Sequence, residues 1–91
     1  MERIHAVAKG RVQGVGYRYF VLECAHATGV RGYVKNLPDG TVEIVAESSP
    51  AALGEFLRLT HAKNHPIIRV GEIVVQNGPA TGEFHGFRAA W

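Results

Sequence analysis

The chain has 91 residues, 46% of them apolar and 20% charged, and a formal net charge of +2 that is spread along the sequence. This composition is typical of a folded globule and excludes a disordered chain, and the length suits one core, so residues 1–91 are expected to form a single domain. The small charge argues against binding of nucleic acid through its phosphate backbone.

The first expected elements are a strand and a helix joined by a glycine-rich loop. Ile4, Ala6 and Ala8 share one face at a period of two, which predicts a strand over residues 4–9. After the loop, apolar residues recur at spacings of three and four, the pattern of an amphipathic helix that Gly29 ends as a C-cap. This apolar stripe consists of Tyr17, Phe20, Val21, Cys24 and Ala27 or Thr28.

A β-hairpin is expected next. Strand-forming residues over 30–36 and 41–47 flank the turn residues 37–40, in which Pro38 and Gly40 favour a turn. In the second strand, apolar residues at a period of two face the core, and the residues between them face water. The core-facing residues are Val42, Ile44 and Ala46, and the water-facing residues are Thr41, Glu43 and Glu47.

The remaining elements are a second helix, a fourth strand and a tail. The Ser-Pro sequence at 49–50 is typical of a helix start, and this helix is expected to end near Lys63. Residues 67–76, rich in Ile and Val, predict the fourth strand, and the Asn-Gly-Pro sequence at 77–79 predicts a turn after it. The tail from Phe84 to Trp91 is expected to add a short edge strand whose aromatic side chains complete the core.

The order strand, helix, strand, strand, helix, strand predicts an α+β ferredoxin-like βαββαβ sandwich, with two helices packed on one face of an antiparallel sheet. In this topology the first helix reverses the chain, so the first two strands run parallel and end on the same side of the sheet. The loop after the first strand and Asn36, at the end of the second strand, are therefore expected to meet.

The loop at residues 10–18 is a candidate anion site. Its glycines permit positive φ, which lets successive backbone N–H groups turn inward, and the helix start adds further unpaired N–H groups. Arg18 falls in the first helical turn, where its guanidinium can close over a bound anion, and a phosphoryl group is the natural guest. The amides expected to hold it are those of Gln13, Gly14, Val15, Gly16, Tyr17 and Arg18.

Two stretches, Gly-Arg-Val-Gln-Gly-Val-Gly-Tyr-Arg at 10–18 and the sequence from Gly29 to Val42, carry a family resemblance. In this order and spacing they resemble the acylphosphatase family, and the similarity extends over essentially the whole chain. The resemblance implies hydrolysis of acyl phosphates to a carboxylate and inorganic phosphate without a metal or other cofactor. It implies that Arg18 binds the phosphoryl group and that Asn36 orients the attacking water. The sequences at 64–70 and 87–91 fit the family less well.

The side-chain chemistry agrees with that implication. Asn36 offers an acceptor and a donor that can orient a water, but an amide is too weak a base to deprotonate it. The reaction then requires an easy leaving group, and a carboxylate, with a pKa of roughly 4 in its protonated form, is one. We expect a small-molecule acyl phosphate as substrate, inorganic phosphate as product and a monomeric protein.

Two other functions remain open. The same fold hosts RNA-recognition domains, although residues 41–48 lack the stacking aromatics that such domains need. Alternatively, a non-catalytic regulatory domain with the same loop would bind phosphate and hydrolyse nothing. Phosphate release from an acyl phosphate separates the enzyme from both.

A structural role is expected for Cys24, and the five histidines show no usual metal-ligand spacing. Cys24 lies on the apolar helix stripe, which predicts a buried thiol, and a lone cysteine is typical of a reducing compartment. His61 and His65 are four residues apart but lack a third metal ligand. No signal-peptide pattern or membrane-spanning run is present, so a cytoplasmic protein without membrane contact is expected. The start at Met1 argues against a domain excised from a larger enzyme.

Overall fold

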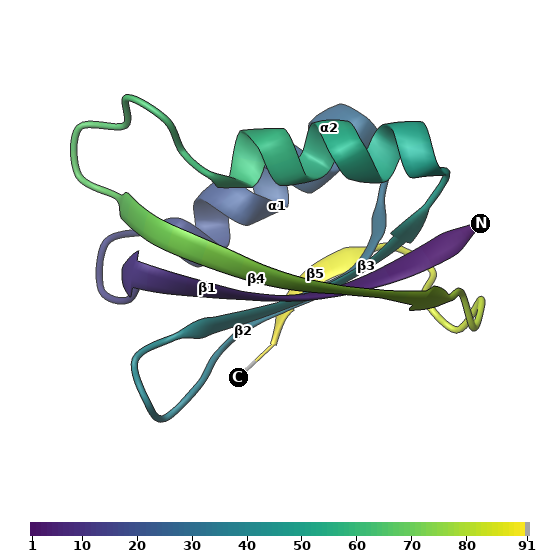
Figure 1. The fold of residues 1–91 in the computed structure, drawn as a ribbon, viewed down its shortest axis with the longest axis horizontal. Coiled ribbons are helices and arrows are strands. Elements are labelled where there is room, and N and C mark those ends of the chain that lie inside the picture. The colour runs from purple at the N-terminus through teal and green to yellow at the C-terminus, as the bar shows by residue number, and fades with distance from the viewer. Residues whose placement is uncertain (91) are drawn as a thin grey trace.

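A computed structural model describes residues 1–90, which form five strands and two helices, and Trp91 lies outside the described part (Figure 1). The elements in chain order are β1 (Glu2–Arg11), α1 (Tyr17–Thr28), β2 (Arg31–Asn36), β3 (Val42–Ser48), α2 (Pro50–Thr60), β4 (Arg69–Pro79) and β5 (Phe87–Ala90). Both helices cover one face of the sheet. The first six elements confirm the predicted ferredoxin-like α+β order.

The strands form one sheet in the order β4-β1-β3-β2-β5. β1 and β2 both pair antiparallel with β3, so they run parallel to each other, as predicted. Their registers place Ala8 of β1 and Asn36 of β2 on either side of the same residue, Val42. The C-terminal ends of β1 and β2 therefore lie at the same end of the sheet.

The tail forms β5, the short edge strand that the sequence predicts. It pairs parallel with β2, which makes the sheet mixed rather than purely antiparallel. The Phe87 ring lies 5.7 Å from the Phe56 ring, so the strand contributes an aromatic side chain to the core. Lys35 pairs with Ala90, and the end of β5 therefore lies beside the end of β2.

The core lies between the sheet and the two helices, and Ile4, Ala6 and Ala8 are buried in it as predicted. The buried Tyr17 hydroxyl donates to the carbonyl of Thr60 at 2.7 Å, which ties the start of α1 to the end of α2. Cys24 is also buried, as predicted, and burial raises the pKa of its thiol to about 11. This thiol is therefore protonated near neutral pH and suited to packing rather than chemistry.

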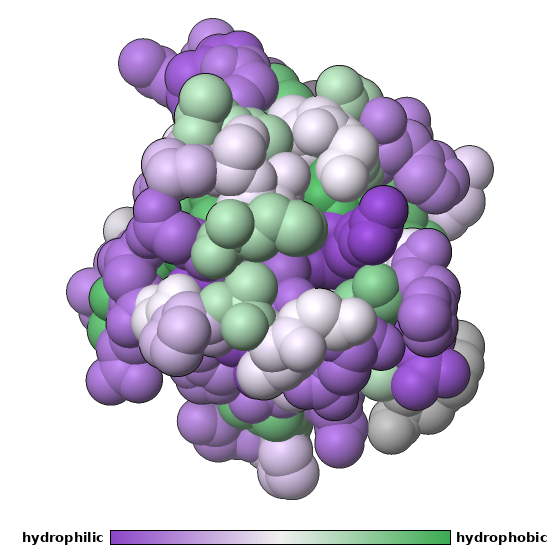
Figure 2. All heavy atoms as spheres, turned by 90° about the vertical axis from the view of Figure 1, so that its right-hand side faces the viewer, coloured by the Kyte–Doolittle hydropathy of each residue, from purple (hydrophilic) through white to green (hydrophobic). Residues whose placement is uncertain are grey.

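The surface of the molecule is mixed in character. At the end from which the N-terminus projects, hydrophilic residues predominate and apolar residues lie in small groups between them (Figure 2). Within residues 1–90, neither helix combines the length and the apolar character needed to cross a bilayer.

The predicted end of α2 is wrong, because the helix stops at Thr60 rather than near Lys63. His61 Nδ1 lies 2.8 Å from the Leu57 carbonyl oxygen and satisfies a group of the last turn. Ala62 then takes a positive φ of 50°, which turns the chain away from the helix axis.

The predicted turn at 77–79 is also wrong, because these residues belong to β4. The strand starts at Arg69 and runs through Pro79, which pairs with Glu2. β4 is an edge strand, and a proline is tolerated there because its missing N–H can face away from the sheet.

Glu47 departs most from its predicted position, since it was expected to face water and is only 2% exposed. Its carboxylate accepts hydrogen bonds from Arg3 Nε at 2.8 Å and from the backbone N–H groups of Thr81 and Gly82 at 2.9 and 3.0 Å. Burial opposes ionisation of this group, but the hydrogen bonds outweigh burial and lower the pKa of Glu47 to about 2. The carboxylate thus fastens the connection between β4 and β5 to the sheet.

Glu47→Gln is expected to lower the free energy of unfolding at pH 7 by about 2–3 kcal/mol, because the charge-assisted hydrogen bonds are weakened. The pKa of about 2 lies below the ordinary value of 4.5. The difference in free energy of unfolding between the wild type and Glu47→Gln is therefore complete above pH 4.5 and declines as the pH falls toward 2. Urea unfolding at several pH values measures it, with the exposed Glu72→Gln as control. A difference between wild type and Glu47→Gln that stays constant across this range contradicts the assignment.

Candidate active site

The loop between β1 and α1 has the positive φ values that the sequence predicts for its glycines. Gly14 and Gly16 have φ values of 72° and 81°, and Gly16 is the N-cap of α1 without a side-chain hydrogen bond to the helix start. In the described chain, no backbone N–H of residues 13–16 donates a hydrogen bond. These donors, together with the positive end of the α1 dipole, make the loop suitable for an anion.

Gln13 makes a connection that the sequence did not reveal. Its side-chain amide donates to the carbonyls of Leu37 and Thr41 at 2.7 and 2.8 Å. Both carbonyls belong to the turn between β2 and β3, directly after Asn36. The loop and the end of β2, predicted to meet, are therefore joined by one side chain. The sequence indicates only a backbone role for Gln13, because nothing in the neighbouring residues shows where its side-chain amide is directed.

Arg18 is the second residue of α1 and lies in the predicted first turn. Its Nη1 donates to the carbonyl of Ala90 at 3.2 Å, which holds the guanidinium at the end of β5. Ala90 is the partner of Lys35 in the parallel pairing, and Lys35 precedes Asn36. The guanidinium is therefore held at the same end of the sheet as the C-terminal end of β2.

Asn36 is the last residue of β2 and shares a strand face with the buried Val34, so its side chain is on the helix-covered side of the sheet. Its Oδ1 is buried and has no hydrogen-bond partner among residues 1–90. An unpaired buried acceptor costs about 1–3 kcal/mol, and proteins seldom retain one without a reason. A water or ligand that donates to Oδ1 would remove that cost.

The remaining residues of the predicted loop site are two glycines, Gly14 and Gly16, and two residues with apolar or aromatic side chains, Val15 and Tyr17. Tyr17 is buried in the core and Val15 packs against it, so their side chains face inward. In Figure 1 the loop after β1 and the turn between β2 and β3 lie at the same end of the molecule. This arrangement combines open backbone donors, a guanidinium and a buried amide oxygen, which suits a bound phosphoryl group and an adjacent water.

Among residues 1–90, candidate metal ligands are not grouped at this end of the sheet. Across the described chain, no three His, Cys, Asp or Glu residues are grouped so that they could hold a metal ion. His5 lies on the face away from the helices, where its Nε2 is 2.8 Å from a carboxylate oxygen of Glu43. His61 and His65 belong to the loop between α2 and β4.

Comparison with known sequences identifies close relatives. The acylphosphatase family profile matches residues 4–89. The acylphosphatase of Thermus thermophilus is 49% identical over 83 residues, which cover 90% of this chain and 92% of that protein. The acylphosphatase of Methanospirillum hungatei is 40% identical over 82 residues, which cover 90% of each chain.

Comparison with solved structures agrees. The acylphosphatase from Bacillus subtilis has a TM-score of 0.93 and 36% identity, and the match covers 100% of both chains. HypF from T. kodakarensis has a TM-score of 0.85 and 35% identity, and the match covers 100% of this chain and 12% of HypF. The chain therefore belongs to the acylphosphatase family, whose members are hydrolases that act on the acid anhydride bond of acyl phosphates.

Proposed function

We propose that the chain hydrolyses acyl phosphates by in-line attack of a water that Asn36 orients, on a phosphoryl group held by Arg18 and the amides of residues 13–18. Membership of the family supports the reaction, and one contact supports the roles proposed for these residues. This contact is the pair of hydrogen bonds from Gln13 to the turn after Asn36, which joins the anion-binding loop to the end of β2. The substrate is a small molecule, and the protein acts as a cytoplasmic monomer.

The loop and Arg18 stabilise the charge that develops on the phosphoryl group. In phosphoryl transfer this charge is spread over three equatorial oxygens, so several donors fixed in advance are more effective than one. The backbone donors are held by the positive φ values of Gly14 and Gly16. Arg18 adds a fork of N–H donors that matches the phosphoryl oxygens.

Asn36 positions the nucleophile. A water that donates to the buried Oδ1 has its oxygen lone pairs directed elsewhere, and the enzyme uses them against phosphorus opposite the leaving oxygen. The water oxygen forms the new bond to phosphorus, and the bond between phosphorus and the acyl oxygen breaks with its electron pair. The carboxylate leaves without a general acid, and the water proton passes to a phosphoryl oxygen. No step in this sequence uses a metal or cofactor.

The direct test is phosphate release from benzoyl phosphate by the purified chain. We expect hydrolysis that inorganic phosphate inhibits competitively, because product and substrate share the loop. Activity is expected to be unchanged after treatment with a chelator. Phosphate binding without hydrolysis would favour a regulatory domain, and loss of activity with the chelator would contradict the metal-independent mechanism.

A further inference from the structure

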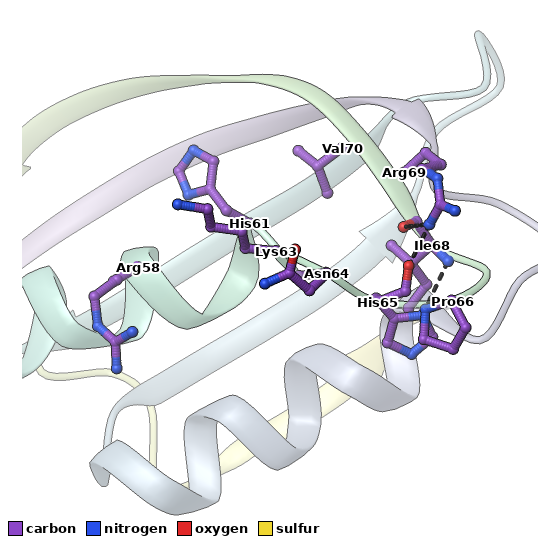
Figure 3. Close-up of a pocket in the computed structure, with 10 residues that line it drawn as sticks. Arg58, His61, Lys63, Asn64, His65, Pro66, Ile68, Arg69 and Val70 are labelled. Atoms are coloured by element: carbon purple, nitrogen blue, oxygen red, sulfur yellow. Dashed lines mark hydrogen bonds between the residues drawn. The ribbon is translucent and has the colours of Figure 1, made fainter.

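A cavity of about 900 Å³ lies at the end of α2 and contains neither Arg18 nor Asn36 among its lining residues. It is formed by the last turn of α2, the loop over residues 61–68 and the start of β4, and we name it the α2–β4 pocket. Figure 3 shows that the side chains of His61, Lys63 and Asn64 project from this loop, with His65 and Arg69 at the far end near β4. Its volume is within the range of small-molecule sites, roughly 300–1,000 Å³.

The charge of the α2–β4 pocket is of one sign. The basic residues that line it are Arg58, His61, Lys63, His65 and Arg69. None of the described residues that line the pocket is Asp or Glu. Glu55, one helical turn before Arg58, pairs with that guanidinium and offsets its charge. Lys63 and Arg69 remain as positive charges, and this asymmetry favours an anionic ligand.

Two of the basic side chains, those of His65 and Arg69, are held in place by the loop backbone. Arg69 Nη1 donates to the carbonyls of His65 and Ile68. His65 Nδ1 accepts from the backbone N–H groups of Ile67 and Ile68 at 3.1 and 3.0 Å, so its ring proton is on Nε2. These two polar groups are therefore fixed by the fold before any ligand arrives, which favours affinity because less order remains to be imposed.

The backbone of the same loop departs from ordinary geometry at two places. Ala62 and Asn64 have positive φ values of 50° and 66°, and they are the two non-glycine residues with positive φ in the described chain. For alanine this conformation is unfavourable, and such strain tends to occur at binding sites. The bonds from Ala62 N–H to the Leu59 carbonyl and from His65 N–H to the Ala62 carbonyl hold the loop in this form.

The interior of the α2–β4 pocket is apolar. Pro66 is exposed and Val70 is half-buried, so these two side chains present apolar surface in the pocket, whereas Ala62 and Ile68 in the same lining are already buried by the protein. A bare inorganic ion would leave Pro66 and Val70 against water. A ligand that joins an apolar body to two negative groups would instead cover the apolar lining and reach the basic side chains.

We propose that the α2–β4 pocket is a second binding site, for a small organic anion with an apolar body and two anionic groups. The site is separate from the phosphoryl loop in its lining residues, although both lie at one end of the molecule, where Arg11 pairs with Arg69. It does not depend on the catalytic roles proposed for Arg18 and Asn36.

The test uses naphthalene-1,5-disulfonate as the probe and the backbone amide NMR signals of the full chain as the readout. We expect saturable shifts in residues 61–70 and at least about tenfold weaker binding by sulfate, equivalent to about 1.4 kcal/mol. Lys63→Glu is expected to weaken probe binding about tenfold, because it replaces an attractive charge by a repulsive one. Arg31→Glu makes the same charge change on an exposed residue at the other end of β2 from Asn36 and is expected to leave binding unchanged.

Three results would overturn the proposal. The first is that probe shifts centre on residues 12–18 and disappear when inorganic phosphate is added, which places the probe in the active site. The second is that sulfate binds as tightly as the probe, which removes the need for the apolar lining. The third is that Arg31→Glu weakens binding as much as Lys63→Glu, which shows attraction to overall charge. Lys63 is exposed and makes no hydrogen bond among residues 1–90, so the variant is expected to fold.

Discussion

Arg18→Ala is expected to lower kcat/KM for benzoyl phosphate by about 10²–10³, because a fixed donor to the phosphoryl oxygens is lost where negative charge develops. The affinity for inorganic phosphate should fall as well, since the same guanidinium binds the ground state. Initial-rate measurements with benzoyl phosphate and phosphate inhibition constants give the two effects separately. Activity close to that of the wild type would remove Arg18 from the site.

Two further variants sharpen this experiment. Arg18→Lys keeps the charge but not the planar fork, and we expect activity between those of Arg18→Ala and the wild type. Arg88→Ala removes an exposed guanidinium from β5 without approaching the loop and is expected to be fully active. Arg18→Ala also loses the bond to Ala90, which contributes roughly 0.5–1.5 kcal/mol, so its unfolding is measured in parallel. Loss of activity far beyond loss of stability identifies a role in the reaction.

Much of the fold could be predicted because local signals and tertiary packing agree. The alternation of Ile4, Ala6 and Ala8 identifies a strand with one buried face, and all three are buried. Ser49 caps α2 as its sequence position predicts, since its hydroxyl accepts from the Ala52 N–H at 3.2 Å. Gly29 ends α1 with a left-handed φ of 74°. In each case the residue type itself restricts the backbone.

The predictions that failed concern residues whose environment is set by distant parts of the chain. Glu47 alternates correctly with Ala46 and was expected to face water, but the segment after β4 covers it. The sequence at 77–79 has the composition of a turn, yet pairing with β1 keeps it extended. Neither outcome can be predicted from neighbouring residues. Thr81, which bonds to Glu47, and Glu2, which pairs with Pro79, each lie more than 30 positions away from their partners.

The candidate site divides in the same way. Topology placed the loop and Asn36 together because parallel strands end on the same side, a property of the chain order and not of any single side chain. The two hydrogen bonds of the Gln13 side chain and the hydrogen bond from Arg18 to the Ala90 carbonyl could be found only in the structure. The α2–β4 pocket could not be predicted from the sequence either. Its loop has positive φ at Ala62 and Asn64, and neither residue type by itself predicts a binding pocket.

Asn36→Ala is expected to lower kcat for benzoyl phosphate by about 10², because a nucleophile that is no longer oriented loses a factor of this size. KM is expected to change little, since the phosphoryl group is held by Arg18 and the loop. This division distinguishes the variant from Arg18→Ala, which affects both parameters. Asn77→Ala, on the exposed part of β4, serves as the control and should retain wild-type kinetics.

The stability of Asn36→Ala separates a catalytic role from a structural one by its sign. A structural asparagine is stabilising, so its removal lowers the free energy of unfolding. The Oδ1 of Asn36 is instead buried without a partner in the described chain, so its removal is expected to leave the free energy of unfolding unchanged or to raise it by about 1 kcal/mol. Urea unfolding of the variant at neutral pH decides between them. A less active and less stable variant would show that Asn36 supports the turn, whereas a less active and equally or more stable one fits a residue retained for the water it holds.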